Sequence, residues 1–192
     1  MLQIVKDTNV EDKNRDLFIK SIIRECKEQD VKYKLVTQED YLDVDKPTII
    51  TDPYTYSKPM IYNNVDLDTT SNVIFDIIKE LPSSEILLIG RGLIAHPLIS
   101  MIIDKTNHTL TVANSHTTTA HLQNLIDDAD IIINTSTSVI HTNLPMNNKL
   151  VIDINNNFQC NIDMISKGNY YNMRSIGKAT VSKIVSNSKN NL

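Results

Sequence analysis

The stretch Glu85–Pro97, which reads EILLIGRGLIAHP, decides the fold of this chain. Its apolar first part, Glu85–Ile89, predicts a buried strand, and a helical pattern follows Gly92. A tight glycine turn before a helix presents free N–H groups and the positive end of the helix dipole, which suit a phosphate. The third glycine of G-x-G-x-x-G is replaced by Ala95, which the looser form of that motif allows. Nucleotide binding and an ordinary strand-to-helix turn therefore both remain open.

Strands and helices alternate outward from this stretch. Short apolar runs predict strands over residues 2–5, 33–37, 47–51, 85–89, 108–113, 130–134 and 149–154. Amphipathic spacing predicts helices over residues 12–29, 72–81, 93–105, 119–127 and 176–186, with Thr69–Ser71 as the cap of the second. Because strands separated by helices favour parallel βαβ units, we predict an α/β fold with a Rossmann-like parallel sheet.

The composition excludes several classes of function. The 192 residues carry a net charge of −4, so no basic field favours nucleic acid as a partner. No apolar run approaches the ~20 residues of a membrane helix, and the first residues lack the apolar core of a signal peptide. Cys26 and Cys160 have no metal-ligand spacing and predict reduced thiols in a cytoplasmic protein. Glycine is scarce, with 4 residues where a usage of about 7% would give roughly 13.

The end of the strand after the glycine turn bears on cofactor choice. An NAD site places an acid there for the ribose 2′-hydroxyl, but this chain reads Ala113-Asn114-Ser115-His116-Thr117. Polar and potentially cationic groups suit a 2′-phosphate better, so a bound dinucleotide is predicted to be NADP rather than NAD. The alternative is that His116 is an ordinary exposed loop histidine.

Five segments of the chain together resemble a known family. They are IGRGLIAHP (89–97), TVANSHT (111–117), ADIIIN (129–134), VIDI (151–154) and IGKATV (176–181). They are similar to I-G-R-S-x-x-V-G-x-P, T-V-x-x-C-H-S-x-T, A-D-I-x-I-x-A-x-G, V-I-D-V-G and P-G-G-V-G-P-x-T of the bifunctional methylenetetrahydrofolate dehydrogenase/cyclohydrolase (FolD) family. The resemblance implies a truncated α/β N-terminal domain over residues 1–68. It also implies an NAD(P)-binding Rossmann-like domain with a C-terminal helix over residues 69–192.

The resemblance also implies site residues and an assembly. On the folate side it points to Phe18, in place of a family Tyr, and to Asp66, which matches the acid that holds the pterin ring. Family members are homodimers through a sheet edge, so a homodimer is expected. The NAD(P)-binding residues that it implies are Gly90, Arg91, Gly92, Leu93, Ile94, Asn114, Ser115, His116, Thr135, Ser136 and Ile176.

The chain departs from the family at positions that matter for chemistry. Ile22 replaces the catalytic Lys of the cyclohydrolase step and Thr51 replaces its Gln. Since an Ile side chain carries no proton, we expect the cyclohydrolase activity to be lost. The glycine after V-I-D-V is Asn155, the A-x-G stretch is Asn134–Ser136, and the P-G-G loop is replaced by residues 172–175. Each change adds a side chain where the backbone of a relative approaches a ligand.

Two hypotheses of function follow. The first is an NAD(P)-dependent oxidoreductase of the methylenetetrahydrofolate dehydrogenase type, because the nicotinamide carries the hydride chemistry and the protein mainly orients it. No catalytic residue is assigned under this hypothesis. The second is a pseudoenzyme, a non-catalytic protein that binds a nucleotide or a folate and serves regulation or assembly. The missing Lys, Tyr and Gln motivate it.

Overall fold

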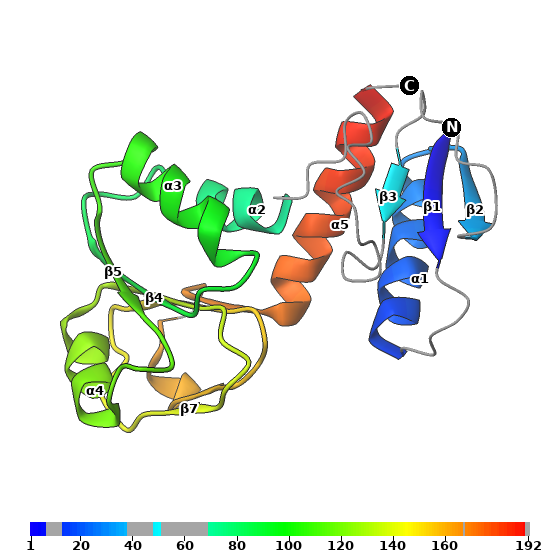
Figure 1. Cartoon of the computed structure of the whole chain (residues 1–192). Coiled ribbons are helices and arrows are strands. Elements are labelled where there is room, and N and C mark those ends of the chain that lie inside the picture. The colour runs from blue at the N-terminus through cyan, green and yellow to red at the C-terminus, as the bar shows by residue number, and fades with distance from the viewer. Residues whose placement is uncertain (7–12, 38–47, 51–68, 167, 191–192) are drawn as a thin grey trace. The chain divides into compact units, whose positions relative to one another are not determined.

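The chain divides into two compact units in a computed structural model that describes residues 1–6, 13–37, 48–50, 69–166 and 168–190 (Figure 1). The first unit comprises residues 1–67 together with 178–192, and the second comprises residues 68–177. The functional residues predicted near the glycine turn all belong to the second unit.

The first unit is a small parallel α/β layer. Its strands β1 (Leu2–Lys6), β2 (Tyr33–Thr37) and β3 (Thr48–Ile50) pair in the order β2-β1-β3. The helix α1 (Lys13–Glu28) turns an apolar stripe inward, because its buried residues recur at helical spacing. The core of this unit consists of Leu2, Ile4, Ile19, Ile22, Cys26, Val31, Val181 and Val185.

The last helix, α5 (Met173–Asn190), contributes to both cores and is longer than predicted. Ile176 packs in the core of the second unit, whereas Val181 and Val185 pack in the core of the first. The side chain of Gln29 at the end of α1 is held by Ser182 and Ser186, with the Ser186 hydroxyl donating to Oε1 at 3.1 Å. The domain predicted from the sequence, residues 69–192, included this whole helix. In the structure, the helix residues from Lys178 onward group with the first unit.

The second unit is a five-stranded sheet in the order β10-β8-β6-β4-β5, and every neighbouring pair is parallel. Its strands are β4 (Glu85–Ile89), β5 (Thr109–Ala113), β6 (Ile131–Asn134), β8 (Leu150–Asp153) and β10 (Tyr170–Asn172). The helices are α2 (Thr69–Ile78), α3 (Ala95–Lys105) and α4 (Thr119–Asp128), with a short 3₁₀ turn η1 (Ile162–Met164). A second, two-stranded sheet joins β7 (Ile140–His141) and β9 (Phe158–Gln159).

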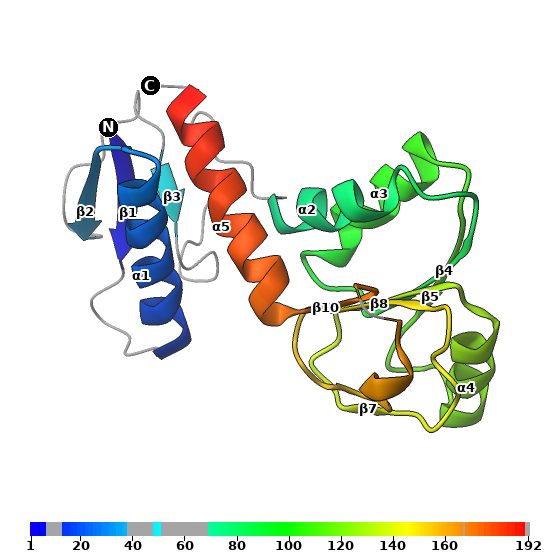
Figure 2. The same ribbon diagram turned by 180° about the vertical axis from the view of Figure 1, so that it is seen from behind.

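Helices cover both faces of the five-stranded sheet, as the apolar strands require (Figures 1 and 2). Along β4, Ile86 and Leu88 pack into the core with α2 and α3. Leu87 and Ile89 point the other way and pack into the core with α4. The α/β fold with a Rossmann-like parallel sheet is therefore confirmed, together with a small α/β N-terminal part.

The structure differs locally from the predictions. The helix α2 begins at Thr69 rather than Asn72, and Ser71 is no cap, because its hydroxyl donates to the Ile94 carbonyl at 2.8 Å. The edge strand β10 was not predicted, since three residues are too few for a periodic pattern.

Candidate nucleotide-binding site

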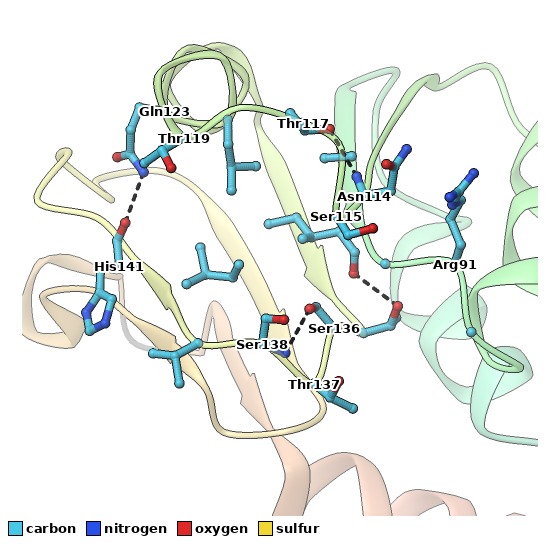
Figure 3. Close-up of a pocket in the computed structure, with 18 residues that line it drawn as sticks. Arg91, Asn114, Ser115, Thr117, Thr119, Gln123, Ser136, Thr137, Ser138 and His141 are labelled. Carbon is cyan, nitrogen blue, oxygen red and sulfur yellow. Dashed lines mark hydrogen bonds between the residues drawn. The ribbon is translucent and has the colours of Figure 1, made fainter.

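A cavity of about 730 Å³ lies at the carboxyl ends of β4, β5 and β6 (Figure 3). The chain runs from β4 to β5 on one side and then returns to β6 on the other side of β4. In open parallel sheets, ligands bind in the crevice at such a reversal of strand order. The volume lies within the range of small-molecule sites.

Gly90 closes the floor of this cavity because it contacts the loop after β6. Its φ angle is +115°, and a Cβ at this position would overlap the hydroxyl of Thr135 and lie 3.1 Å from the Ser136 nitrogen. The Thr135 N–H donates to the carbonyl of Ile89 at 2.8 Å, which fixes the two loops together. The absence of a side chain at Gly90 is therefore required by the packing of the protein itself.

Gly92 differs from Gly90, because a Cβ there would meet nothing within 4 Å. It stands at the start of α3, where the N–H groups of Ala95 and His96 donate to its carbonyl. The N-cap residue, Ile94, supplies no side-chain hydrogen bond to the helix. Because Gly92 lines the cavity, an uncapped helix amino terminus lies beside it.

The end of β5 is a turn that its own side chains hold. The amide oxygen of Asn114 accepts a hydrogen bond from the His116 N–H at 2.9 Å. The Thr117 hydroxyl accepts one from the Asn114 N–H at 3.1 Å. Asn114, Ser115 and Thr117 line the cavity and His116 does not. The turn thus presents amide and hydroxyl groups, with no carboxylate.

A buried polar network around Asn134 and Asp153 holds the loop after β6 in place. Asn134 and Asp153 are both fully buried, and the Asn134 amide donates to Asp153 Oδ1 at 3.0 Å. The same amide donates to Asn157 Oδ1 at 2.6 Å, and Asn134 Oδ1 accepts from the Ser136 N–H at 3.1 Å. Asp153 also accepts from the Phe158 N–H at 2.9 Å. A buried carboxylate needs such donors, so this network fixes the geometry of the cavity floor.

Asn155, which the resemblance placed where the family has a glycine, extends this network rather than entering the cavity. Its amide donates to the carbonyls of Thr135 at 3.2 Å and Ser136 at 2.8 Å. The Asn157 amide donates to the same Ser136 carbonyl at 2.8 Å. Asn155 does not line the cavity, so the added side chain does not fill this cavity.

The cavity suits an anion at one wall and an apolar ring at another. Arg91 is the only Lys or Arg among the described lining residues, and no Asp or Glu is among them. Hydroxyl groups surround the cavity, and the Gln123 amide donates to the His141 carbonyl at 2.9 Å (Figure 3). The apolar part of the lining comes from Ile89, Ala113, Leu122, Val139 and Ile140.

Cys160 and Tyr170, which are near Asp153, stay protonated. Burial raises the pKa of the Cys160 thiol and of the Tyr170 phenol, and the negative charge of Asp153 raises both further. Neither group is therefore an ionised nucleophile near neutral pH. Among the residues that the structure describes, no group of three His, Cys, Asp or Glu side chains could hold a metal ion.

The structure brings together only part of the residues that the resemblance implied. Those that line the cavity are Gly90, Arg91, Gly92, Asn114, Ser115, Thr135 and Ser136. Leu93, Ile94 and His116 flank it without lining it, and Ile176 is 2% exposed in the apolar core. Sequence reasoning missed Thr117, Thr119, Leu122, Gln123 and residues 137–141. The run Thr135-Ser136-Thr137-Ser138 after a buried strand was the available signal for part of this wall.

The residues that the resemblance implied for a folate fall in the first unit. Phe18 is half-buried and packs against the core of that unit, and Ile22 is fully buried within it. Asp66 and Thr51 lie outside the described residues.

Three solved structures share the fold of this chain. No protein-family model matches the sequence, and no curated protein does. A 5,10-methylenetetrahydrofolate dehydrogenase from Bombyx mori is similar with a TM-score of 0.70 and 11% identity, over 99% of this chain and 86% of that one. The bifunctional FolD enzyme from Campylobacter jejuni is similar with a TM-score of 0.71 and 15% identity, over 100% and 88%. FolD from Trypanosoma brucei, complexed with NADP cofactor and inhibitor, has a TM-score of 0.67 and 11% identity, over 99% and 85%.

The second unit thus has a doubly wound parallel sheet, with a cavity at the reversal of strand order. The fold of the chain is that of the FolD dehydrogenase/cyclohydrolases, at a sequence identity that marks it as divergent from them. Among the described residues, no helix is both long and apolar enough to cross a membrane.

Proposed function

We propose that the cavity binds NADP(H) and that the chain is an oxidoreductase of the methylenetetrahydrofolate dehydrogenase type without cyclohydrolase activity. One observation carries the proposal: the cavity wall that follows β4 and β5 holds Arg91, Asn114 and Ser115 and no carboxylate. A ribose 2′-hydroxyl is bound by an acid at the end of the second strand, whereas a 2′-phosphate is accommodated by a nearby Arg. This wall therefore favours NADP over NAD.

The remaining lining fits the rest of an adenine nucleotide. The backbone of Arg91 and Gly92, just before α3, lies at the cavity and is the part that would face the 5′-phosphates. Leu122, Val139 and Ile140 provide apolar contact for an adenine ring. The residues present thus fit the cofactor that the FolD fold uses in the Trypanosoma brucei complex.

Hydride transfer needs few chemical groups from the protein itself. The nicotinamide supplies the hydride chemistry when bound, and the residues of the cavity bind and orient the cofactor. The cyclohydrolase step needs a proton-transfer group where this chain has Ile22, which is fully buried among apolar side chains. Loss of that step and retention of hydride transfer are therefore compatible.

A hydride-transfer assay tests this proposal. Methylenetetrahydrofolate is offered with NADP and with NAD, and the reduced cofactor is followed by its absorbance. We expect turnover with NADP, and a Kd for NADP about tenfold or more below that for NAD. Absence of turnover with both cofactors, in protein whose fold is verified by circular dichroism, rejects the dehydrogenase.

A second candidate is a non-catalytic protein that binds a nucleotide or a folate and serves regulation or assembly. It is favoured by the side chains that hold the end of β8, since Asn155 bonds to the loop after β6 and Asn156 Oδ1 accepts from the Met173 N–H at 3.2 Å. Saturable binding of NADP or a folate in calorimetry, without turnover, supports this candidate over the first.

We propose that either function is carried out by a homodimer, as the resemblance implies, and in the cytoplasm, as the thiols of Cys26 and Cys160 suggest. The net charge of −4 supports a partner other than nucleic acid. Sedimentation at several protein concentrations, with and without NADP, tests the dimer.

A further inference from the structure

The cavity is confined to the ends of three neighbouring strands of the five-stranded sheet. Its described lining comes from the ends of β4, β5 and β6, from α4 and from residues 137–141 (Figure 3). Among the described residues, none that follows β8 or β10 lines it. In doubly wound parallel sheets a ligand lies across the reversal of strand order. Here the described lining spans the reversal between β4 and β6 but extends no further than the loop after β6.

The backbone just after β6, at the limit of the cavity, is already hydrogen-bonded within the chain. The carbonyls of Thr135 and Ser136 accept from the Asn155 amide, and Ser136 accepts a second bond from the Asn157 amide at 2.8 Å. Each of these carbonyls would otherwise be an acceptor for a donor group of a ligand. A carboxamide that approaches them must displace an amide of the protein.

The ends of β8 and β10 are tied in the same manner. Asn156 has a positive φ of 53°, and its Oδ1 accepts from the Met173 N–H at 3.2 Å. The helix α5 follows β10 directly, and Asn172 Oδ1 accepts from the Ser175 N–H at 3.0 Å as its cap. These first-turn donors of α5 are thus satisfied by asparagine side chains rather than left for a ligand.

We propose that the cavity is a receptor for phosphorylated adenosine alone, so that an adenosine mononucleotide with 2′- and 5′-phosphates binds nearly as tightly as NADP. This inference rests on the proposed function, since it concerns the same cavity. It implies that such mononucleotides compete with NADP and that the nicotinamide half adds little affinity.

Calorimetric titration of the full chain with NADP, adenosine 2′,5′-bisphosphate and nicotinamide mononucleotide tests the proposal. We expect the Kd of the bisphosphate within about threefold of that of NADP, and no saturable binding of nicotinamide mononucleotide at millimolar concentration. Binding of NADP about thirtyfold or more tighter than the bisphosphate overturns the proposal while leaving NADP binding intact.

Two further outcomes separate the inference from the proposed function. Comparable binding of the bisphosphate and NADP, without turnover in the hydride-transfer assay, supports the inference and rejects the proposed dehydrogenase. Absence of binding by both overturns the two together.

The variant Asn155→Gly tests whether the asparagine bonds cause this restriction. Removal of its amide frees the carbonyl of Thr135, so we expect NADP to gain about fivefold in affinity relative to the bisphosphate. Asn148→Gly is the matched control, because Asn148 is exposed, has a φ of 65° and lies outside the cavity lining. An affinity ratio in Asn155→Gly equal to that of the control overturns the role given to Asn155.

Discussion

The two halves of the carboxyl edge of the large sheet use their polar side chains in opposite ways. At the ends of β4 and β5, Arg91 and Ser115 line a cavity and have no hydrogen bond or ion pair among the described residues. At the end of β8, Asp153 and Asn155 hydrogen-bond to neighbouring loops of the chain. The ends of β4 and β5, which we call the open half, are thus available to a ligand, whereas the ends of β6 and β8, which we call the fastened half, are held by asparagine side chains.

The largest expected effect comes from the joint between the cavity loops, at Gly90. In Gly90→Ala the new Cβ overlaps Thr135 and sits at a φ of +115°, so we expect a loss of about 2–4 kcal/mol in the free energy of unfolding. Urea unfolding followed by circular dichroism measures it. The control is Gly92→Ala, whose Cβ meets nothing within 4 Å and which should change stability by about 0.5 kcal/mol or less. Equal stability of the two variants contradicts the close approach of the β4 and β6 loops.

The fastened half should also be sensitive, through Asn134. In Asn134→Ala, the buried Asp153 carboxylate loses a donor and the Ser136 N–H loses its acceptor. Since buried polar groups without partners cost about 1–3 kcal/mol each, we expect a loss of about 2–3 kcal/mol in the free energy of unfolding. Asn161→Ala, which removes an exposed bond to the Asp163 N–H, is the control and should cost about 1 kcal/mol or less. A similar loss in both variants would show that the network contributes no more than a surface cap.

The difference between these halves was only partly predictable from the sequence. The strands 85–89 and 131–134 are apolar throughout, and such runs between helices predict buried parallel strands. The strands β7, β9 and β10 have two or three residues, which is too short for a periodic pattern.

The site was predictable only where a strand ends in a motif. Gly90, Arg91 and Asn114 follow recognisable strands, so their place on the cavity could be anticipated. The direction of the Asn155 amide could not, because it depends on a loop that is nineteen or twenty residues away in the sequence. The wall at residues 137–141 follows no strand-to-helix signal, so its place on the cavity depended on the tertiary fold.

A smaller effect is expected in the open half, from Arg91. In Arg91→Gln a charge-assisted contact to a phosphate is lost, so the Kd for NADP should rise about tenfold and that for NAD about twofold or less. Calorimetric titration at two salt concentrations measures both. Arg174→Gln is the control, since Arg174 is exposed and outside the cavity lining, and it should leave both values unchanged. A uniform loss of affinity for NADP and NAD would place Arg91 at the shared phosphates rather than at the 2′-phosphate.

The smallest effect concerns pH and two half-buried groups near Asp153, Cys160 and Tyr170. The pKa of Cys160 and that of Tyr170 are raised in the folded protein by burial first and by the charge of Asp153 second. A raised pKa means that the folded state holds its proton longer than the unfolded state does. The associated stability is therefore fully present below the ordinary pKa of each group and is lost as the pH rises toward the folded value.

Thermal unfolding between pH 7 and pH 10 should accordingly show a melting temperature that falls above about pH 8.5, the ordinary pKa of a thiol. Cys160→Ala removes one of the two groups and should make this fall shallower. Leu81→Ala, at an exposed site without a titratable group, should lower the curve little and leave its slope unchanged. An unchanged slope in Cys160→Ala would mean that the thiol titrates alike in the folded and unfolded states, and that the fastened half is less shielded from water than its hydrogen bonds indicate.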